Sequence, residues 1–194
     1  MFYTKKIKDA IRVAIRVHEL DQKQKRKGKD VPYIIHPLIV GLILSRVNAE
    51  EDMVVAGILH DTIEDSVESK KITRADLEKR FGKEVASIVW DVTEKDQKIK
   101  WEERKKRALR EIKSMPLKSL IVKSADTIAN CSELIADFRK EGESTFRRFA
   151  MPKEKQLGHY INVIRVIKKR TKLNPLAKDL TENLKQLKGI LAIG

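Results

Sequence analysis

The stretch MVVAGILHDTIED, residues 53–65, decides the fold of this chain. Its first seven residues are apolar on every side of a helix, which predicts a helix buried in the core. His60 and Asp61 follow at the inner end of this helix, and Glu64 and Asp65 come within one further turn. Because a buried charge must be paired or must coordinate a metal, these four side chains predict a metal site with acid and base groups beside it.

The composition is typical of a helical globular protein with a single domain. The chain has 194 residues, of which 41% are hydrophobic and 36% are charged, with only 8 glycines and 5 prolines. This length allows one sizeable core. No apolar run approaches the roughly 20 residues of a membrane span, the N-terminus has no apolar signal-peptide core, and the single Cys131 fits a reducing compartment. We therefore expect a cytoplasmic protein with no membrane partner.

The net charge of +14 predicts attraction to polyanions. Nucleic acid, an acidic membrane or a substrate with several phosphates would each suit this charge. The alternative is a lysine-rich surface whose side chains are simply solvated, because the basic residues are spread over the whole chain.

Helical periodicity covers most of the chain, and no segment alternates with the period of two that marks a strand. Thr73 and Asp76 have the spacing of a capping box, and Gly82 follows a helix end. Pro37 favours a first helical position, which predicts His36 as an N-cap. We therefore predict an all-α fold, a compact multi-helix bundle, with helices over residues 4–18, 37–47, 53–61, 73–81, 83–92, 101–114, 117–138, 153–170 and 176–188.

Histidine is scarce, and its four positions are His18, His36, His60 and His159. A lone histidine is more often a satisfied core or surface group than a ligand, and we expect His18 to be such a group. His60 differs because Asp61 follows it directly, and a further carboxylate, Asp126, lies in an otherwise apolar helix. Imidazoles and carboxylates without thiolate suit an octahedral ion such as Mn²⁺ or Fe²⁺ better than a structural zinc.

One face of the helix predicted over residues 117–138 carries three polar groups. Lys123, Asp126 and Asn130 are three and four residues apart, so they lie on the same side of that helix. The face is either an ordinary solvated surface or part of a site.

Several segments occur in the order found in RelA/SpoT-type alarmone hydrolases, which are HD-domain phosphohydrolases. Residues 24–27 (QKRK) and 32–37 (PYIIHP) resemble the entry motif of that family, and residues 59–65 (LHDTIED) resemble its central motif. Residues 92–95 (VTEK) are similar to its Val-Thr-Lys segment, and residues 123–130 (KSADTIAN) to its Lys-x-Ala-Asp-x-x-x-Asn helix. The resemblance covers most of the chain and is closest to the stand-alone small hydrolases.

The resemblance implies an HD-domain bundle with a central site for Mn²⁺ or another divalent metal. The implied ligands are His36, His60, Asp61 and Asp126. Residues 1–170 would form the HD-type phosphohydrolase domain, and residues 171–194 a C-terminal helical extension. Leu176, Leu180, Leu184 and Leu187 line one face of that extension, which is suited either to cover the domain or to meet a second copy in a homodimer.

The resemblance also implies an activity, the removal of the 3′-diphosphate from guanosine tetraphosphate or pentaphosphate. The products would be pyrophosphate and GDP or GTP. Glu64 and Asp65 would act on the water and on the leaving group, with no division of these tasks between them. The alternative for both is an ordinary loop acid.

Four residues are expected to bind this polyphosphorylated nucleotide. Arg26 and Lys27 would screen its phosphates without competing for the metal. Asn130 and Tyr160 would help to hold the nucleotide in place.

Two other functions stay open. Ala129 stands where the family usually has His or Tyr, and the family's phosphate-binding arginine near Tyr160 has only Gln156 or Lys155 as a counterpart. These departures allow an HD-domain phosphohydrolase that acts on another nucleotide. The charge of +14 allows a non-enzymatic nucleic-acid-binding helical protein, although only 5% of the residues are aromatic and able to stack on bases. We therefore do not expect nucleic acid as the partner.

Overall fold

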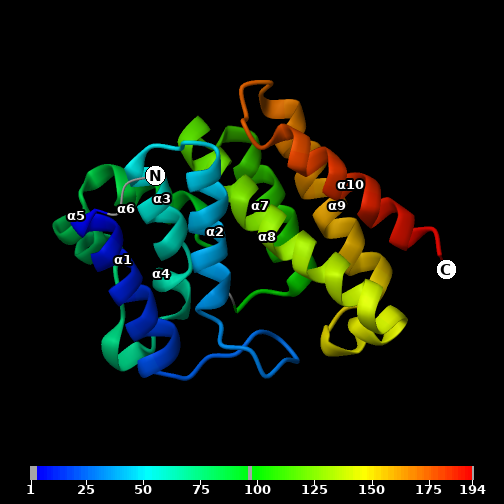
Figure 1. Ribbon diagram of the computed structural model, residues 1–194, viewed down its shortest axis with the longest axis horizontal. Helices are drawn as coiled ribbons and strands as arrows, with labels where there is room; N and C mark the ends of the chain where they lie inside the picture. Colours follow the sequence, from blue (N-terminus) through cyan, green and yellow to red (C-terminus); the bar gives the residue numbers. More distant parts are fainter. Residues whose placement is uncertain (1–3, 96–97, 194) are drawn as a thin grey trace.

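The computed structural model describes residues 4–95 and 98–193, and over this range the chain is helical without a strand, which confirms the all-α class (Figure 1). Residues 1–3, 96–97 and 194 lie outside the described residues, so the ends of the predicted domain and of its C-terminal extension are not described. None of the described helices combines the length and the apolar character needed to cross a bilayer. In chain order the helices are α1 (Lys5–Ile15), η1 (Arg16–Leu20), α2 (Ile35–Arg46), α3 (Glu51–Leu59), α4 (Thr62–Asp65), η2 (Glu68–Lys70), α5 (Arg74–Phe81), α6 (Lys83–Val92), α7 (Trp101–Ser114), α8 (Leu117–Glu141), η3 (Gly142–Arg148), α9 (Lys153–Arg170) and α10 (Ala177–Leu191).

Helix α3 lies at the centre of the bundle. Every residue from Met53 to Leu59 is buried, and α3 contacts α1, α2, α6 and α8. A helix with neighbours on several sides needs an apolar surface all round, which the sequence of residues 53–59 provides. His60 follows directly and is therefore held at the inner end of the core.

Helices α2 and α3 approach closely because a glycine from each faces the contact. A Cβ atom added at Gly57 would lie 2.5 Å from Leu44 Cδ1, and one added at Gly41 would lie 2.8 Å from Ile58 Cγ1. A close-packed interior has no room for either methyl group without a shift of the neighbours. The two glycines thus set the spacing between these helices.

Helix α8 has neighbours on both of its long sides. It contacts α2, α3 and α6 as well as α9 and α10, so it lies between the two groups of helices (Figure 1). Leu176, Leu180 and Leu187 have no exposed surface. Helix α10 contacts α8 and α9, so the buried leucines of the C-terminal segment lie within the bundle of this chain.

Two local predictions differ from the structure. The prediction of His36 as an N-cap is wrong, because α2 begins at Ile35 and His36 lies in its first turn. A turn that starts at Pro32 already forms these hydrogen bonds: Ile35 N–H donates to Pro32 O (3.3 Å), and His36 N–H donates to Tyr33 O (2.9 Å). The helix predicted over residues 4–18 divides into α1 and the π-helix η1.

Candidate metal centre and adjoining cavity

Three buried side chains, one from α2, one from α8 and one from the residue that follows α3, meet beside the end of α3. The donor atoms of His36, His60 and Asp126 all lie within 4.8 Å of one another. His36 Nε2 is 3.2 Å from His60 Nε2 and 3.3 Å from Asp126 Oδ1, and His60 Nε2 is 3.7 Å from the same carboxylate oxygen. The structure therefore brings together residues that are far apart in the sequence and that were predicted as ligands.

Asp61 lies against the same two imidazoles. Its Oδ2 atom is 2.9 Å from His60 Nε2 and 3.8 Å from His36 Nε2. The hydroxyl of Tyr33 donates a hydrogen bond of 2.6 Å to that oxygen. All four predicted ligands are thus in one cluster, and Tyr33 orients one of them.

Hydrogen bonds outside the cluster fix the orientation of its ligands. His60 Nδ1 lies 2.8 Å from Gly57 O, and because a carbonyl only accepts, Nδ1 carries a proton, so Nε2 is the ring nitrogen that faces the cluster and is able to bind an ion in place of a proton. Asp126 is held at both oxygens, since Lys123 Nζ donates to Oδ2 (2.8 Å) and Asn130 Nδ2 donates to Oδ1 (2.6 Å). Oriented nitrogen and oxygen donors without thiolate fit a divalent ion.

The charges of the cluster also suit a cation. Burial disfavours the charged forms of all these groups, but the Asp61 and Asp126 carboxylates outweigh it and raise the pKa of His60 to about 9. Burial by itself would raise the pKa of both carboxyl groups. His60 nevertheless lowers the pKa of Asp61, and Lys123 and the histidines lower the pKa of Asp126. The two ionised carboxylates therefore favour a positive charge beside the imidazoles, which is a proton on His60 in the absence of metal and can be a divalent ion in its place.

Glu64 and Asp65 stand beside the cluster on α4, with different surroundings. Glu64 Oε2 accepts a hydrogen bond from the N–H of Glu94 (3.1 Å). Burial, followed by the charges of Asp61, Asp65 and Glu94, raises the pKa of Glu64 to about 7. A carboxyl group with this pKa can take up and release a proton near neutral pH.

Asp65 belongs to a hydrogen-bonded group on the side of η1. Its Oδ2 atom accepts from Gln24 Nε2 (2.9 Å) and lies 3.7 Å from His18 Nδ1. His18 is fully buried, and its Nδ1 lies 2.7 Å from Gln24 Oε1. Burial and the charge of Asp61 raise the pKa of Asp65. Gln24 thus links His18 to Asp65 and limits how far this carboxyl group can move.

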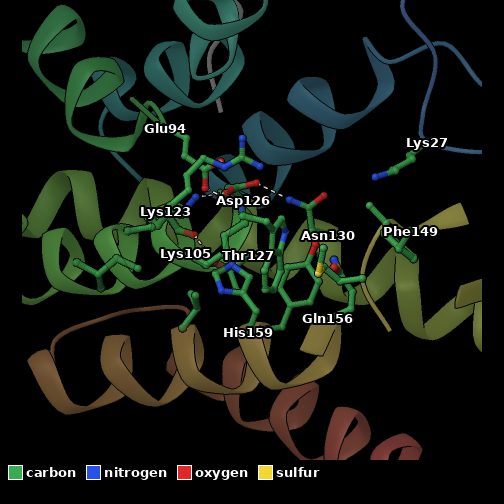
Figure 2. A pocket seen from close by; sticks show the side chains of 18 residues that line it. Lys27, Glu94, Lys105, Lys123, Asp126, Thr127, Asn130, Phe149, Gln156 and His159 are labelled. Carbon is green, nitrogen blue, oxygen red and sulfur yellow. Dashed lines mark hydrogen bonds and ion pairs between the residues drawn. The ribbon is translucent and has the colours of Figure 1, made fainter. Parts of the chain in front are cut away.

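A cavity of about 290 Å³ opens on Asp126 between α7, α8 and α9. Figure 2 shows Lys123, Asp126 and Asn130 side by side on α8, with Gln156 and His159 reaching in from α9. Burial, and then the charges of Lys105 and Lys123, lower the pKa of His159 to about 3, so this imidazole is neutral. The cationic side chains that line the cavity are Lys27, Arg104, Lys105 and Lys123. Glu94 pairs with Arg104 and Lys105, and Asp126 pairs with Lys123, so the walls hold four cations against two carboxylates. This excess of positive charge suits a ligand with several negative charges.

The four predicted nucleotide-binding residues lie at this cavity or at a neighbouring one of about 310 Å³. Lys27, Asn130 and Tyr160 line both cavities, whereas Arg26 lines the second. The Arg26 guanidinium already donates to Glu133 Oε2 from Nε (2.9 Å) and from Nη2 (2.6 Å), and to Asn130 Oδ1 from Nη2 (2.9 Å). Its present partners are therefore protein groups.

The roles of several residues were not predicted from the sequence. Tyr33 contacts Asp61 because α2 packs against the end of α3, and no spacing in the sequence predicts this contact. Arg104 and Lys105 belong to a helix rich in charged residues, so the sequence does not distinguish these two from their charged neighbours. The PYIIHP motif drew attention to His36, and its tyrosine was the available signal for Tyr33.

Comparison with known sequences extends these observations. The family model described as HD domain matches residues 10–153, which include the four clustered side chains. A probable guanosine-3′,5′-bis(diphosphate) 3′-pyrophosphohydrolase of Mycoplasma pneumoniae is 36% identical over 151 residues, which cover 74% of this chain and 20% of that protein. The guanosine-3′,5′-bis(diphosphate) 3′-pyrophosphohydrolase MESH1 of Xenopus tropicalis is 36% identical over 119 residues, which cover 60% of this chain and 64% of that protein. The chain spans about a fifth of the length of relatives such as the Mycoplasma protein.

Solved structures share the fold. One is described as a metazoan ortholog of SpoT that hydrolyzes ppGpp; it has a TM-score of 0.74 and 23% identity, and the match covers 98% of this chain and 99% of that chain. A protein of Listeria monocytogenes has a TM-score of 0.71 and 29% identity, with 81% of this chain and 99% of that chain covered. These likenesses show the fold, and the family match over residues 10–153 shows the family. The chain belongs to the HD domain family, and this membership implies a divalent metal ion.

Proposed function

We propose that this protein is a metal-dependent pyrophosphohydrolase that removes the 3′-diphosphate from guanosine tetraphosphate or pentaphosphate. The observation that carries the proposal is the position of Asp126, which belongs both to the ligand cluster and to the wall of a cationic cavity. A metal ion held there would adjoin the phosphates of a bound substrate. The activity named for the Mycoplasma and Xenopus relatives is the second support.

We assign the metal ligands as His36, His60, Asp61 and Asp126, and the metal as Mn²⁺. Nitrogen and oxygen donors without sulfur favour an ion of this kind over a structural zinc. When bound, the ion supplies a Lewis acid for a phosphoryl oxygen and lowers the pKa of water in its neighbourhood. The chain contributes the orientation of the ligands through Tyr33 and its other hydrogen-bonding partners.

We assign the proton transfer to Glu64. Its carboxyl group has a pKa of about 7 and is fixed by the N–H of Glu94, a residue that also lines the cavity. In its ionised form, Glu64 takes the proton of the attacking water. Asp65, held by Gln24 beside His18, orients the reacting groups.

Lys27, Asn130 and Tyr160 are proposed to contact the nucleotide, since all three line both cavities. Lys123 and the α7 cations would offset the charge of the phosphates as they enter. The same arrangement accounts for part of the +14 net charge without a nucleic-acid partner. Helix α10 packs on α8 and α9 with its apolar face. We therefore propose that a homodimer of this protein, which we expect in the cytoplasm, forms through a different face.

The test is incubation of the purified protein with guanosine tetraphosphate and Mn²⁺. The expected products are GDP and pyrophosphate in equal amounts, and chelation of the metal should stop their formation. His60→Ala and Asp61→Ala should abolish turnover because each removes a ligand. Absence of product with every divalent metal tried would contradict the proposal.

A second candidate is an HD-domain phosphohydrolase for another nucleotide. Gln156 lines the cavity in the region where the alarmone hydrolases carry a phosphate-binding arginine. A panel of nucleotides at equal concentration separates the two candidates. Faster release of phosphate from ordinary nucleotides than of pyrophosphate from the 3′ position would favour the second.

A further inference from the structure

A continuous chain of polar contacts leads from the outside of α8 to the ligand cluster. Glu133 binds the guanidinium of Arg26 at Nε (2.9 Å) and at Nη2 (2.6 Å), and Nη2 also donates to Asn130 Oδ1 (2.9 Å). Asn130 Nδ2 then donates to Asp126 Oδ1 (2.6 Å). That oxygen is the one that faces both His36 and His60.

The direction of each hydrogen bond in this chain is determined by its neighbours. Arginine can only donate, so Asn130 must present its carbonyl oxygen to Arg26. Its amide nitrogen is thereby turned toward Asp126, whose ionised carboxylate can only accept. Arg26 therefore stabilises the one amide orientation of Asn130 that holds Asp126 in place.

Glu133 keeps Arg26 in position. Only 14% of the Arg26 side chain and 30% of the Glu133 side chain are exposed, so the pair is partly shielded from water. Although burial opposes ionisation, hydrogen bonds from Arg26 and Lys29 lower the pKa of Glu133 to about 2. Arg26 Nε and Nη2 both donate to Glu133 Oε2, and Lys29 donates to Oε1, so charge-assisted hydrogen bonds hold both oxygens of this carboxylate.

We propose that Glu133 is a positioning residue for the metal centre, acting on Asp126 through Arg26 and Asn130. In this arrangement Arg26 serves the ligand cluster, and Lys27 is the residue of the basic loop that meets phosphate. The proposal rests on the metal ligands of the proposed function and is independent of which nucleotide is cleaved.

The competing explanation is that Glu133 merely anchors the loop formed by residues 21–32. Lys29 pairs with Glu133 (2.7 Å) and with Asp137 (2.5 Å), and Asp137 also pairs with Arg148. Asp137 lies one helical turn after Glu133 and binds the same loop, and its ion pairs among the described residues are to Lys29 and Arg148. Asp137→Asn is therefore a matched control, because it weakens the anchoring and leaves the contact between Arg26 and Glu133 intact.

The experiment measures Mn²⁺ affinity without nucleotide, by electron paramagnetic resonance, for the wild type, Glu133→Gln, Arg26→Gln and Asp137→Asn. Partners behind a ligand commonly change metal affinity by about 10–100-fold, so we expect a loss of roughly 10-fold for Arg26→Gln and somewhat less for Glu133→Gln. Asp137→Asn should bind Mn²⁺ as the wild type does. The double variant Glu133→Gln with Arg26→Gln should be no weaker than Arg26→Gln alone, since both changes interrupt the same chain of contacts.

Kinetics give a second, independent readout. If Glu133 positions the metal centre, kcat falls in Glu133→Gln at saturating Mn²⁺ and KM stays constant. A lower KM with unchanged Mn²⁺ affinity would overturn the proposal, because it would mean that Glu133 had kept Arg26 from a phosphate. Equal losses of Mn²⁺ affinity in Glu133→Gln and Asp137→Asn would also overturn it.

A wild type that binds Mn²⁺ but hydrolyses no nucleotide contradicts the proposed function alone, whereas a wild type that binds no Mn²⁺ contradicts both proposals.

Discussion

The Nε2 atoms of His36 and His60 lie 3.2 Å apart, although 24 residues separate them in the chain. His36 belongs to the first turn of α2, and His60 follows the last residue of α3. These two helices pass each other at Gly41 and Gly57, where neither backbone has room for a Cβ atom. The geometry of the ligand cluster is therefore a direct consequence of helix packing in the core.

This relationship predicts the effect of Gly57→Ala. The new methyl group would lie 2.5 Å from Leu44 Cδ1 and 3.2 Å from Val40 Cγ1, and because both side chains are buried in the core, we expect α2 and α3 to move apart. Overpacking of this kind typically costs about 1–3 kcal/mol, and we expect a loss of that size in the free energy of unfolding, measured with urea. Mn²⁺ affinity should fall together with stability because the two imidazoles move apart.

Gly189→Ala is the control for this substitution. A Cβ atom at Gly189, near the end of α10, would meet nothing within 4 Å. Alanine favours a helix over glycine by roughly 0.5–1 kcal/mol, so this variant should be slightly stabilised, with unchanged Mn²⁺ affinity. Equal stability of Gly57→Ala and the wild type would contradict the account of the α2–α3 contact.

Tyr33→Phe tests the orientation of Asp61. The substitution removes the hydroxyl that donates to Asp61 Oδ2 (2.6 Å) and leaves the ring in place. We expect Mn²⁺ affinity to fall about 10-fold, as for other groups that orient ligands. Tyr160→Phe provides the comparison, because Tyr160 lines both cavities. It should raise KM for the nucleotide and leave Mn²⁺ affinity unchanged, so the opposite pattern in either variant would contradict the assigned roles.

The sequence allowed prediction of those features that depend on local patterns. The buried helix before His60 follows from its uniformly apolar surface, and the capping box of Thr73 and Asp76 forms as predicted. The meeting of His36 with His60 required the ordered motifs as well, because periodicity does not specify which helices pack together. Contacts such as that of Arg26 with Glu133 could not be predicted, because the partners are 107 positions apart and both residue types are common on surfaces.

The raised pKa of Glu64 predicts a pH-dependent gain in stability for Glu64→Gln in the metal-free protein. Burial and neighbouring carboxylates raise its pKa from 4.5 to about 7. For a carboxyl group shifted in this direction, the contribution to folding is fully present below pH 4.5 and is lost as the pH rises through 7. Glutamine stays neutral, so the variant should match the wild type near pH 4.5 and exceed it at pH 8. Since one pKa unit corresponds to about 1.4 kcal/mol, the gain should be on the order of 1–3 kcal/mol.

The measurement is the free energy of unfolding of both proteins in EDTA at the two pH values. Asp76→Asn is the control with the opposite sign, because hydrogen bonds from Thr73 lower the pKa of Asp76. Its contribution is present above the ordinary pKa of 3.8 and is lost as the pH falls, so Asp76→Asn should be destabilised at pH 8.

Glu64→Gln should also lose hydrolysis, and a variant that kept full turnover would exclude Glu64 as the proton acceptor.

Lys27→Ala tests whether the basic loop meets the substrate through Lys27. Lys27 lines both cavities, and its Nζ lies 5.6 Å from the centre of the Phe149 ring. Hydrogen bonds to charged groups contribute about 1.5–3 kcal/mol, so we expect KM for guanosine tetraphosphate to rise by roughly 10-fold or more at unchanged kcat. Lys25→Ala is the matched control, because Lys25 lies two residues away in the same loop, lines the second cavity but not the one that opens on Asp126, and pairs with Asp30. Because added salt screens exposed charges, KM should depend less steeply on ionic strength in Lys27→Ala than in the wild type. Equal KM values for the two lysine variants would show that Lys27 acts only through the general charge of the loop.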